Sequence, residues 1–396
     1  MSANIILGVT GGIAAYKSLD VASRLTKAGH NVYTIMTESA AEFVNPITFH
    51  SITHLPVEKK LFSTTTTDVK HIGLADKADL VLIAPATANF IAKAAAGIAD
   101  DLLTTVILAT QAPILVAPSM NVHMFENEIV QKNMKTVEDF GYKIITPASG
   151  YLACGYEGKG RLPEAEKLVE TIKKELTSKD LENKKVLISA GPTREAIDPV
   201  RFLTNHSTGK MGYALAKAAA YRGAEVKLVS GPTNLEVPLG VELINVETAA
   251  EMKDSLLAEF DQSDFTIMAA AVSDYRPQVY TKQKIKKKPG DLSLDLERTT
   301  DILSELGKRK KEFQTLVGFA AETENLIENA KKKLVKKNAD FIIANDISKP
   351  NIAFGSDQNQ ISILSKSQVE ELALSTKADL ADKIFDYLLK KLINKN

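Results

Sequence analysis

The chain has 396 residues, which suggests two or three domains, with two as the default at roughly 100–200 residues per domain. Hydrophobic residues make up 44% and charged residues 25%, so the chain can bury sizeable cores and is neither disordered nor fibrous. The 49 basic and 49 acidic residues cancel, which argues against nucleic acid or an anionic membrane as the main partner. The single cysteine, Cys154, excludes an internal disulfide framework and a cysteine-based zinc site.

The beginning of the chain predicts a strand. Residues 1–10 are mostly apolar, with neither a basic start nor a cleavage site, so they do not resemble a signal peptide. No stretch approaches the roughly 18 uninterrupted apolar residues that a membrane span needs. We therefore expect a soluble, cytoplasmic protein without a membrane partner.

Short apolar runs alternate with helical patterns in the first half. The predicted strands are Ile5–Val9, Asn31–Met36, Leu80–Ala84, Ile114–Ala117 and Tyr142–Ile145, and the predicted helices are Ala14–Ala28, Ala88–Ala95 and Glu126–Phe140. This alternation is typical of a parallel sheet covered by helices on both faces. Ligands of such folds bind at the carboxyl ends of the strands, so the loops that follow the strands are the candidate sites.

A polar stretch, Lys173–Lys185, interrupts this pattern, and a new series of elements follows it. The predicted strands are Val186–Ala190, Glu225–Ser230, Phe265–Ala271 and Phe341–Ala344, and the predicted helices are Lys210–Arg222 and Asn325–Lys337. We therefore predict an α/β protein with two consecutive doubly wound domains, at 1–180 and 184–396. The first is expected to be flavodoxin-like or Rossmann-like with a parallel sheet, and the second Rossmann-like, with no longer-range repeat.

A glycine-rich turn follows the first predicted strand. Gly11, Gly12 and Ile13 lead into a helix, and such a turn can present backbone N–H groups to a phosphate. The dinucleotide spacing Gly-x-Gly-x-x-Gly is absent, and the second strand ends at Thr37 without an acidic residue for a ribose, so NAD is disfavoured. A single-nucleotide cofactor such as FMN fits better. A purely structural tight turn is the alternative.

The end of the third predicted strand is a second candidate site. Pro85, Ala86, Thr87, Ala88 and Asn89 combine small residues, which let a planar ring approach the backbone, with two hydrogen-bonding side chains. The alternative is purely structural: Thr87 would cap the following helix, and the pair at 100–101, Asp-Asp, would form another cap.

Two later segments complete the candidate site of the first half. Asn121 follows the fourth strand and could hold a substrate carboxylate, whereas His123 is interpreted as a local structural residue. Cys154 lies among four glycines within residues 150–160, which predicts a mobile lid that closes over substrate and delivers a thiol proton. An incidental free cysteine is the alternative.

In the second half, Ser207-Thr208-Gly209-Lys210 invites comparison with a phosphate-binding P-loop. A Walker motif would need glycine at position 204 and serine or threonine at 211, and these positions hold Thr204 and Met211. The loop can still bind phosphate through its amides at the start of a helix. Lysine bursts at 282–288, 308–311 and 331–337 indicate either solvated surfaces or a local site for a polyphosphate.

These motifs resemble those of a known family. The first half is similar to the homo-oligomeric flavin-containing cysteine decarboxylases, through His71 in His-Ile-Gly-Leu, Asn121 in Pro-Ser-Met-Asn-Val-His-Met and Cys154 in Gly-Tyr-Leu-Ala-Cys-Gly. The whole chain resembles the bacterial bifunctional coenzyme A biosynthesis proteins, which join phosphopantothenoylcysteine decarboxylase to phosphopantothenate–cysteine ligase. The resemblance implies FMN as cofactor, His71 as base, Asn121 as ligand of the substrate carboxylate and Cys154 as proton donor.

For the second half, the resemblance implies a ligase that activates 4'-phosphopantothenate with CTP and Mg2+ and then joins it to L-cysteine. Asn205 and Lys284 are the implied catalytic residues, and Arg201 and Ala271 the implied substrate-binding residues. The implied CTP-binding residues are Met268, Ala269, Ala270, Asp274, Lys284, Thr300, Asp301, Ile302, Leu303, Phe319, Lys333 and Lys337. Trimeric decarboxylase contacts and dimeric ligase contacts would combine in a homo-oligomer such as a dodecamer.

Three other functions are weighed against this one. An NAD-dependent dehydrogenase lacks its dinucleotide fingerprint here. A non-catalytic flavin-binding regulatory protein would not need His71, Cys154 and a complete second domain. Nucleic-acid binding would rest on the lysine bursts alone, and neither the net charge of zero nor the 6% aromatic content favours it.

Overall fold

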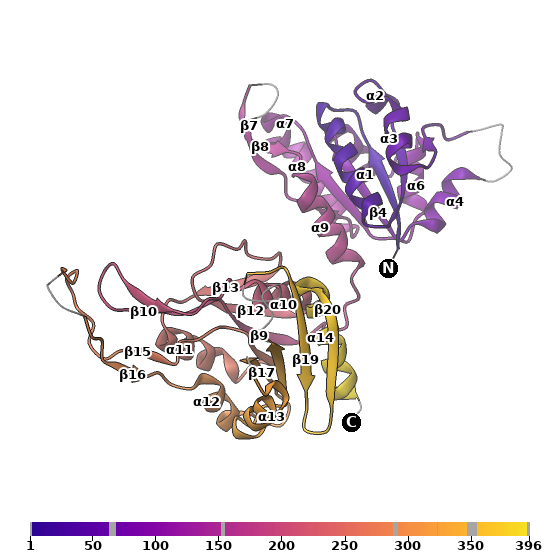
Figure 1. The fold of residues 1–396 in the computed structure, drawn as a ribbon. Helices are drawn as coiled ribbons and strands as arrows, with labels where there is room; N and C mark the ends of the chain where they lie inside the picture. Colours follow the sequence, from indigo (N-terminus) through magenta and orange to yellow (C-terminus); the bar gives the residue numbers. More distant parts are fainter. Residues whose placement is uncertain are drawn as a thin grey trace. The chain divides into compact units, whose positions relative to one another are not determined.

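The structure is a computed structural model of the 396-residue chain and describes residues 2–62, 69–151, 155–287, 292–322, 324–346 and 355–393. The chain divides into two compact units, Met1–Thr177 and Ser178–Asn396, and each is described by itself (Figure 1). The predicted domain limits, 1–180 and 184–396, lie within a few residues of this division. Part of the polar stretch Lys173–Lys185 is helical, because the last helix of the first unit ends at Leu176.

The first unit is built on a six-stranded sheet whose neighbouring strands are all parallel, in the order β3-β2-β1-β4-β5-β6. This is the Rossmann order, not the 2-1-3-4-5 order of flavodoxin, and it reverses direction between β1 and β4. The strands are β1 (Asn4–Val9), β2 (Asn31–Met36), β3 (Val57–Glu58), β4 (Leu80–Ala86), β5 (Ile114–Pro118) and β6 (Lys143–Ile144).

Helices cover both faces of this sheet because its strands are apolar on both sides. Ile5 and Leu7 of β1 pack in one core with α1, α3 and α9, whereas Ile6 packs on the other face with α4, α5, α6 and α8. The helices are η1 (Ile13–Lys17), α1 (Ser18–Lys27), α2 (Glu38–Ala41), α3 (Pro46–Thr53), α4 (Lys70–Lys77), α5 (Ala88–Ala96), α6 (Leu102–Ala109), α7 (Val122–Glu126), α8 (Glu128–Asp139) and α9 (Ala165–Leu176).

The second unit has an eight-stranded sheet in the order β13-β12-β9-β14-β17-β18-β19-β20. Its first six strands are parallel and repeat the Rossmann order, with the reversal between β9 and β14, and β19 and β20 add an antiparallel edge. The strands are β9 (Lys185–Ala190), β12 (Glu225–Ser230), β13 (Val241–Asn245), β14 (Phe265–Met268), β17 (Thr315–Glu322), β18 (Phe341–Asp346), β19 (Gln358–Leu364) and β20 (Val369–Thr376).

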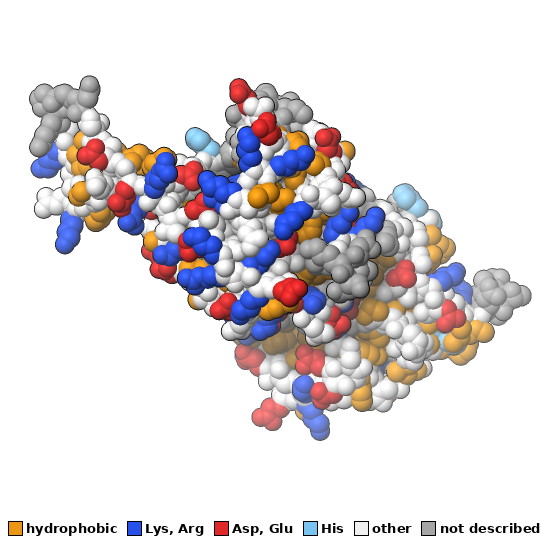
Figure 2. Space-filling view, turned by 90° about the horizontal axis from the view of Figure 1, so that it is seen from below, with side chains coloured by type: hydrophobic (Ala, Val, Ile, Leu, Met, Phe, Trp, Pro, Cys, Tyr) orange, Lys and Arg blue, Asp and Glu red, His pale blue; other side chains and the backbone are white. Residues whose placement is uncertain are grey.

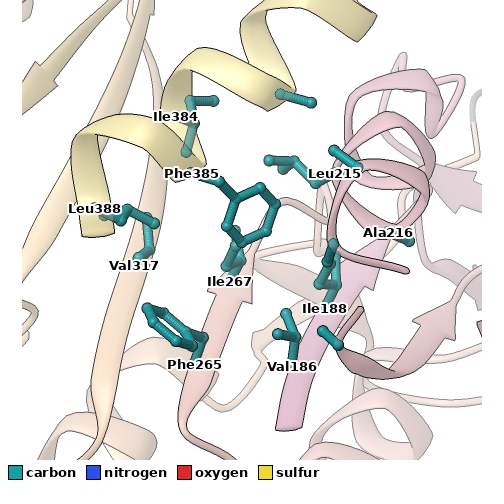
Figure 3. Close-up of a cluster of buried hydrophobic side chains, with 14 of the residues drawn as sticks. Val186, Ile188, Leu215, Ala216, Phe265, Ile267, Val317, Ile384, Phe385 and Leu388 are labelled. Carbon is teal, nitrogen blue, oxygen red and sulfur yellow. The ribbon is translucent and has the colours of Figure 1, made fainter. Parts of the chain in front are cut away.

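Two buried clusters hold the second unit together, one on each face of its sheet. Figure 3 shows the cluster in which Phe385 and Leu388 of α14 lie over Ile267 and Val317, next to Leu215 of α10. On the other face α11, α12 and α13 pack against the sheet. The helices are α10 (Lys210–Tyr221), α11 (Ala249–Phe260), α12 (Ile302–Arg309), α13 (Leu326–Lys336) and α14 (Lys377–Ile393).

Three small antiparallel hairpins stand outside the two sheets. They pair β7 (Ala148–Tyr151) with β8 (Glu157–Arg161), β10 (Arg194–Ala196) with β11 (Phe202–Thr204), and β15 (Tyr275–Pro277) with β16 (Leu296–Arg298).

Two predicted elements differ from the structure. The predicted helix 126–140 corresponds to α8 (Glu128–Asp139), which starts at residue 128 because the side chain of Asn127 accepts a hydrogen bond from the Ile129 amide. The short helix α7 (Val122–Glu126) before it was not predicted. The predicted strand 265–271 ends at Met268, where the chain leaves the sheet.

The surface is electrically mixed. Figure 2 shows basic and acidic side chains interspersed over the face in view, in keeping with the net charge of zero. Among the described residues, no helix is both long and apolar enough to cross a membrane.

Candidate active sites in the two units

The first unit contains a cavity of about 960 Å³ at the carboxyl ends of β1 and β4, where the strand order reverses. Eight of the residues predicted for cofactor or substrate line this cavity: Gly11, Gly12, Ile13, Thr37, Thr87, Ala88, Asn89 and Asn121. Pro85 and Ala86 do not line it. Their carbonyl groups instead accept hydrogen bonds from Thr10 and Ser119, which join the ends of the neighbouring strands.

The turn after β1 requires glycine for a steric reason that the sequence did not indicate. A Cβ atom on Gly11 would lie 2.3 Å from Cβ of Ser39, so α2 packs directly against the turn. A Cβ atom on Gly12 would meet only Cγ2 of Thr87, at 3.8 Å. The Thr10 hydroxyl accepts a hydrogen bond from the Thr87 amide at 3.0 Å and fixes the two strand ends to each other. The cavity therefore has a rigid backbone floor.

Several polar residues of this cavity are helix caps. The side chains of Thr37, Thr87 and Asn121 accept hydrogen bonds from the amides of Ala40, Phe90 and His123 and begin α2, α5 and α7. The predicted structural role of Thr87 is therefore confirmed, and a capping role does not prevent these residues from also facing a ligand.

The predicted cap at 100–101 is half right. Asp101 forms a capping box with Thr104 at the start of α6. The prediction is wrong for Asp100, which instead pairs with Lys93 at 2.8 Å. All four of these residues line the cavity, so the ion pair adds charge to its wall.

The predicted glycine-rich lid is an antiparallel hairpin of β7 and β8 on either side of residues 152–154. Cys154 itself lies outside the described residues. Gly160, with φ of 134°, lines the cavity, and its carbonyl accepts a hydrogen bond from the Met120 amide at 3.0 Å. A Cβ atom there would lie 2.3 Å from the Met120 carbonyl oxygen. This glycine therefore permits close packing of β8 beside Asn121.

The two histidines of the first unit's motifs lie away from the cavity floor. His71 lies in the first turn of α4, a helix that the sequence analysis did not predict, and it is not among the residues that line the cavity. The exposed ring of His123 contacts the ring of Tyr156 edge-on, with centroids 4.9 Å apart. His123 is thus a local structural contact, as predicted.

The second unit contains a cavity of about 830 Å³ at the corresponding place, near the carboxyl ends of β9 and β14. It is lined by Asn205 and Ala271 and by nearly every predicted CTP-binding residue: Met268, Ala269, Ala270, Asp274, Thr300, Asp301, Ile302, Leu303, Phe319, Lys333 and Lys337. Lys284 and Arg201 are not among the lining residues. The cavity is also lined by Lys210, Asn345 and Lys377, which were not among the predicted CTP-binding residues.

Lys333 and Lys337 lie on one face of α13, as their spacing predicts. Lys333 donates a hydrogen bond to the Phe319 carbonyl at 2.7 Å, and Lys337 forms an ion pair with Asp301, the cap of α12. Burial alone would raise the pKa of Asp301, but the hydrogen bond from Lys337, together with the Ser304 amide and the nearby charges, lowers it overall. These groups make a charged wall that is tied to the backbone on both sides.

Polar atoms of two other side chains complete this cavity. The Asn205 side-chain nitrogen donates to the carbonyls of Ala271 and Val272, at 3.2 and 3.1 Å, and so joins the loop before α10 to the segment after β14. The side-chain oxygen of Asn345 is buried and accepts no hydrogen bond within the described part of the chain. A ligand with an N–H donor would satisfy it, as buried acceptors generally require.

Lys284 and Arg201 belong to a separate arrangement next to this cavity. The buried carboxylate of Asp198 accepts hydrogen bonds from Arg201 Nη2 at 2.5 Å and from the Ile285 amide at 3.0 Å. Arg201 in turn donates to the Ile285 carbonyl at 2.9 Å, so this ion pair holds both backbone groups of the residue after Lys284. The Arg201 guanidinium, with these amides, holds the pKa of Asp198 well below its usual range although burial opposes the shift.

Comparison with known proteins adds independent information. Residues 1–177 match the family model "Flavoprotein", and residues 181–392 match "DNA/pantothenate metabolism flavoprotein C-terminal domain". The chain is 50% identical over 387 residues to the coenzyme A biosynthesis bifunctional protein CoaBC of Bacillus subtilis, covering 96% of this chain and 95% of that protein. The chain belongs to the family of bifunctional coenzyme A biosynthesis proteins.

Other members and one solved structure are also similar. The Escherichia coli protein of the same name is 41% identical over 397 residues, covering 99% of this chain and 98% of its own. The crystal structure of the C-terminal domain of a CoaBC protein is 44% identical, covers 55% of this chain and 100% of its own, and gives a TM-score of 0.47. The bifunctional family is the one that the sequence motifs indicated, and it favours neither a dehydrogenase nor a regulatory protein.

The described side chains form no cluster typical of a metal site. Within the described ranges, no group of three or more His, Cys, Asp and Glu residues is arranged to hold a metal ion. In the second cavity Asp274 is exposed and Asp301 is already paired with Lys337.

Proposed function

We propose that this member of the family performs two consecutive reactions of coenzyme A biosynthesis. The second unit joins 4'-phosphopantothenate to L-cysteine at the expense of CTP, and the first unit decarboxylates the product to 4'-phosphopantetheine with FMN as cofactor. The observation that carries the proposal is a large cavity at the strand reversal of each sheet, one with a glycine turn and the other lined by lysines. Full-length similarity to bifunctional relatives supports assigning both reactions to one chain.

The first cavity fits a mononucleotide. The turn at Gly11 and Gly12 opens the helical segment η1–α1, where backbone amides can hold a phosphate. The small residue Ala88 and the polar residues Thr87 and Asn89 lie where a planar ring and its polar edge can be accommodated. When bound, FMN supplies a temporary acceptor for two electrons, which allows a carboxylate on a saturated carbon to leave as CO2.

In the first unit, side chains of the protein bind the substrate and transfer protons. The side-chain oxygen of Asn121 is used in the cap of α7, so its nitrogen is the atom that donates to the substrate carboxylate. His71 accepts a proton from the substrate, and the Cys154 thiol returns one to the product carbon. Gly160 allows β8 to pack next to Asn121, the residue that binds the carboxylate in this proposal. Because β8 follows the Cys154 segment in the chain, this packing links that segment to the carboxylate site.

In the second unit, charge stabilisation explains the lysines. The substrate carboxylate attacks the α-phosphorus of CTP, a P–O bond forms, and the bond to the bridging oxygen breaks so that pyrophosphate leaves with the electron pair. The amine of cysteine then attacks the acyl carbon, loses a proton, and releases CMP. Lys333 and Lys337 bind CTP, and Asn205 and Lys284 act on the acyl-cytidylate. Mg2+ would be bound together with CTP, through the phosphate groups of the nucleotide.

The position of His71 also bears on assembly. Val69 and Ile72 beside it are 57% and 45% exposed, and His71 does not line the cavity of its own unit. An oligomer in which α4 of one copy packs against the cavity of another would bury these apolar residues and bring a histidine to the site. We infer a homo-oligomer, to be tested by light scattering of the purified protein, where a monomer would contradict the inference.

One incubation tests the proposed function directly. Purified protein is mixed with 4'-phosphopantothenate, L-cysteine, CTP and Mg2+, and mass spectrometry follows phosphopantothenoylcysteine, phosphopantetheine and CO2. We expect all three, with a flavin absorbance near 450 nm in the protein. Cys154→Ser should leave ligation intact and abolish phosphopantetheine formation. A colourless protein, or undiminished product from this variant, would contradict the assignment.

A further inference from the structure

Two lysines that were not among the predicted CTP-binding residues line the second cavity. Lys210 is the first residue of α10 and Lys377 the first residue of α14, and both line the cavity. Nζ of Lys210 contacts the Gly355 carbonyl at 2.9 Å and Oδ1 of Asp357 at 2.7 Å, and Nζ of Lys377 contacts the Ser356 carbonyl at 2.6 Å. One short segment, 355–357, therefore receives both ammonium groups.

This arrangement is unfavourable for the protein by itself. A positive side chain at the first residue of a helix faces the positive end of the helix dipole, and both lysines occupy such positions. Burial lowers the pKa of the Lys377 ammonium, and the charge of Lys210 lowers it further, while Asp357 opposes the shift. Asp357 is a weak counter-ion because its side chain is 85% exposed, and solvent screens such a pair.

The pair is also distinct from the lysines already assigned to CTP. Lys333 and Lys337 come from α13, next to Phe319 and Asp301. Lys210 and Lys377 come from α10 and α14, which pack against each other on the opposite face of the sheet from α13. Two lysine pairs from opposite faces of one sheet thus meet a single cavity.

We propose that Lys210 and Lys377 form a phosphate subsite in which both ammonium groups contact one phosphate group of a substrate. An anion there would offset the repulsion between the lysines and use the helix starts at Gly209 and Lys377. The inference rests on the proposed function, because two of the three substrates of the ligation, CTP and 4'-phosphopantothenate, carry phosphate. We assign the pair to the terminal phosphates of CTP, so that the lysines stabilise the charge that develops on pyrophosphate as it leaves.

Binding measurements on charge-neutral variants test the subsite. Lys210→Gln and Lys377→Gln each remove one ammonium group, and Lys383→Gln is the matched control, an exposed lysine on α14 whose Nζ contacts only the Ser375 hydroxyl among the described residues. Calorimetry with CTP, CMP, pyrophosphate and 4'-phosphopantothenate is performed on each full-length variant. Loss of a hydrogen bond to a charged group predicts about tenfold to a hundredfold weaker binding of CTP and pyrophosphate.

The four ligands separate the possible sources of the phosphate. Unchanged CMP affinity together with weaker CTP affinity supports the terminal phosphates. Weaker binding of 4'-phosphopantothenate alone would keep the phosphate subsite but overturn its assignment to CTP. Unchanged affinity for all four ligands in both variants would overturn the subsite itself, whereas a wild-type protein that binds none of them would instead contradict the proposed function.

A thermal melt distinguishes this role from a structural one. Because the fold holds Lys377 at a cost, Lys377→Gln should melt no lower than the wild type without ligand. Added CTP should raise its Tm less than that of the wild type. A variant that melts several degrees lower and yet keeps wild-type CTP affinity would show that the lysine is structural and would overturn the proposal.

Discussion

The two units use the same strand order to build sites that differ in character. The six parallel strands of each sheet have the order 3-2-1-4-5-6, and each cavity lies at the carboxyl ends of the two neighbouring strands where this order reverses, β1 and β4 in the first unit and β9 and β14 in the second. In the first unit a glycine turn and helix caps such as Thr37 and Thr87 line the cavity, together with charged groups such as the Lys93–Asp100 ion pair. In the second unit charged side chains from α10, α13 and α14 line it. The topology therefore fixes the place of a site, and the segments after the strands decide its chemistry.

Under the proposed function, the difference follows from what each ligand requires. A cofactor that stays bound can be held largely by rigid backbone, and helix caps satisfy the backbone groups around it. A nucleotide that is cleaved must have its developing charge stabilised, which requires cations. Each prediction below changes one site by substitution and uses the activity or flavin content of the other unit as a control for correct folding.

The largest expected effect comes from the glycine turn of the first unit. Gly11→Ala places a Cβ atom 2.3 Å from Cβ of Ser39, so the turn must move away from α2. We expect complete loss of bound flavin and of decarboxylation, with normal ligation of 4'-phosphopantothenate to cysteine. The measurement is the absorbance near 450 nm of the purified variant beside a ligase assay.

Ser39 provides a matched test of that steric explanation. Gly11→Ala combined with Ser39→Gly removes the closest atom of the clash and should restore part of the flavin content. If the single variant keeps its flavin, the turn does not need glycine, and the proposed rigidity of this site is wrong.

The next largest effect is expected from the Asp198 carboxylate in the second unit. Asp198→Asn puts an amide nitrogen where Oδ2 accepts from Arg201 and Ile285, so both contacts that hold the segment beside Lys284 are lost. We expect amide formation to slow by roughly 100-fold, the order of effect seen when a catalytic group is misplaced by about 1 Å. Pyrophosphate release in the first turnover should stay normal.

Rapid-quench measurement of acyl-cytidylate, pyrophosphate and amide separates these steps. Lys284→Gln is the reference variant and should give the same profile, with accumulated acyl-cytidylate. Equal slowing of pyrophosphate release in Asp198→Asn would indicate a general structural role and would remove the link to Lys284.

A smaller effect is expected from the lysines of α13. Lys337→Gln removes the partner of Asp301 and a proposed phosphate contact, and we expect about tenfold weaker CTP binding. Lys336→Gln is the control, because Lys336 is exposed on the same helix and does not line the cavity. Calorimetry measures the affinities, and the flavin spectrum should be unchanged in both variants. Equal affinities in the two variants would remove Lys337 from the site.

The sequence predicted the central strands well because they are buried on both faces. Asn31–Met36 and Glu225–Ser230 were predicted with the bounds that β2 and β12 have in the structure. Two of the elements that the sequence did not predict show why. The strand β17 contains Gly318, a residue type that is uncommon inside strands. A Cβ atom there would lie 2.7 Å from Cδ2 of Leu303, so the glycine is required by packing that the sequence does not reveal. α6 is apolar enough to resemble a strand, and only its capping box at Asp101 signals a helix.

The candidate sites show the same limit. Lys333 and Lys337 could be placed together because four residues separate them on one helix. Lys210 and Lys377 belong to helices far apart in the sequence, and only the packing of α10 against α14 brings them to one cavity. Conversely, motif resemblance predicted His71, Arg201 and Lys284 as functional residues without indicating that they lie outside the cavities of their units.

The smallest expected effect concerns acid stability, and it again distinguishes the units. Arg201 and nearby amides depress the pKa of Asp198 in the folded protein, so its stabilising contribution is fully present above the unfolded carboxyl pKa of about 3.9. That contribution fades as the pH falls through this value toward the folded pKa. The free energy of unfolding of the second unit should therefore decrease less between pH 6 and pH 3 in Asp198→Asn than in the wild type.

Urea unfolding at several pH values measures that difference, with Asp261→Asn as the control because its carboxylate is exposed. The difference in the free energy of unfolding between the wild type and Asp198→Asn should become smaller as the pH falls. Protonation of Asp198 weakens its contacts with Arg201 and the nearby amides in the wild type, and these contacts are already lost in the variant. In the first unit, followed by flavin release, Asp198→Asn should leave the pH dependence unaltered. A difference in the free energy of unfolding that stays constant down to pH 3 would mean that the pKa of Asp198 is the same in the folded and unfolded states. The contacts of Asp198 with Arg201 and Ile285 would then not explain how the segment beside Lys284 is held in place.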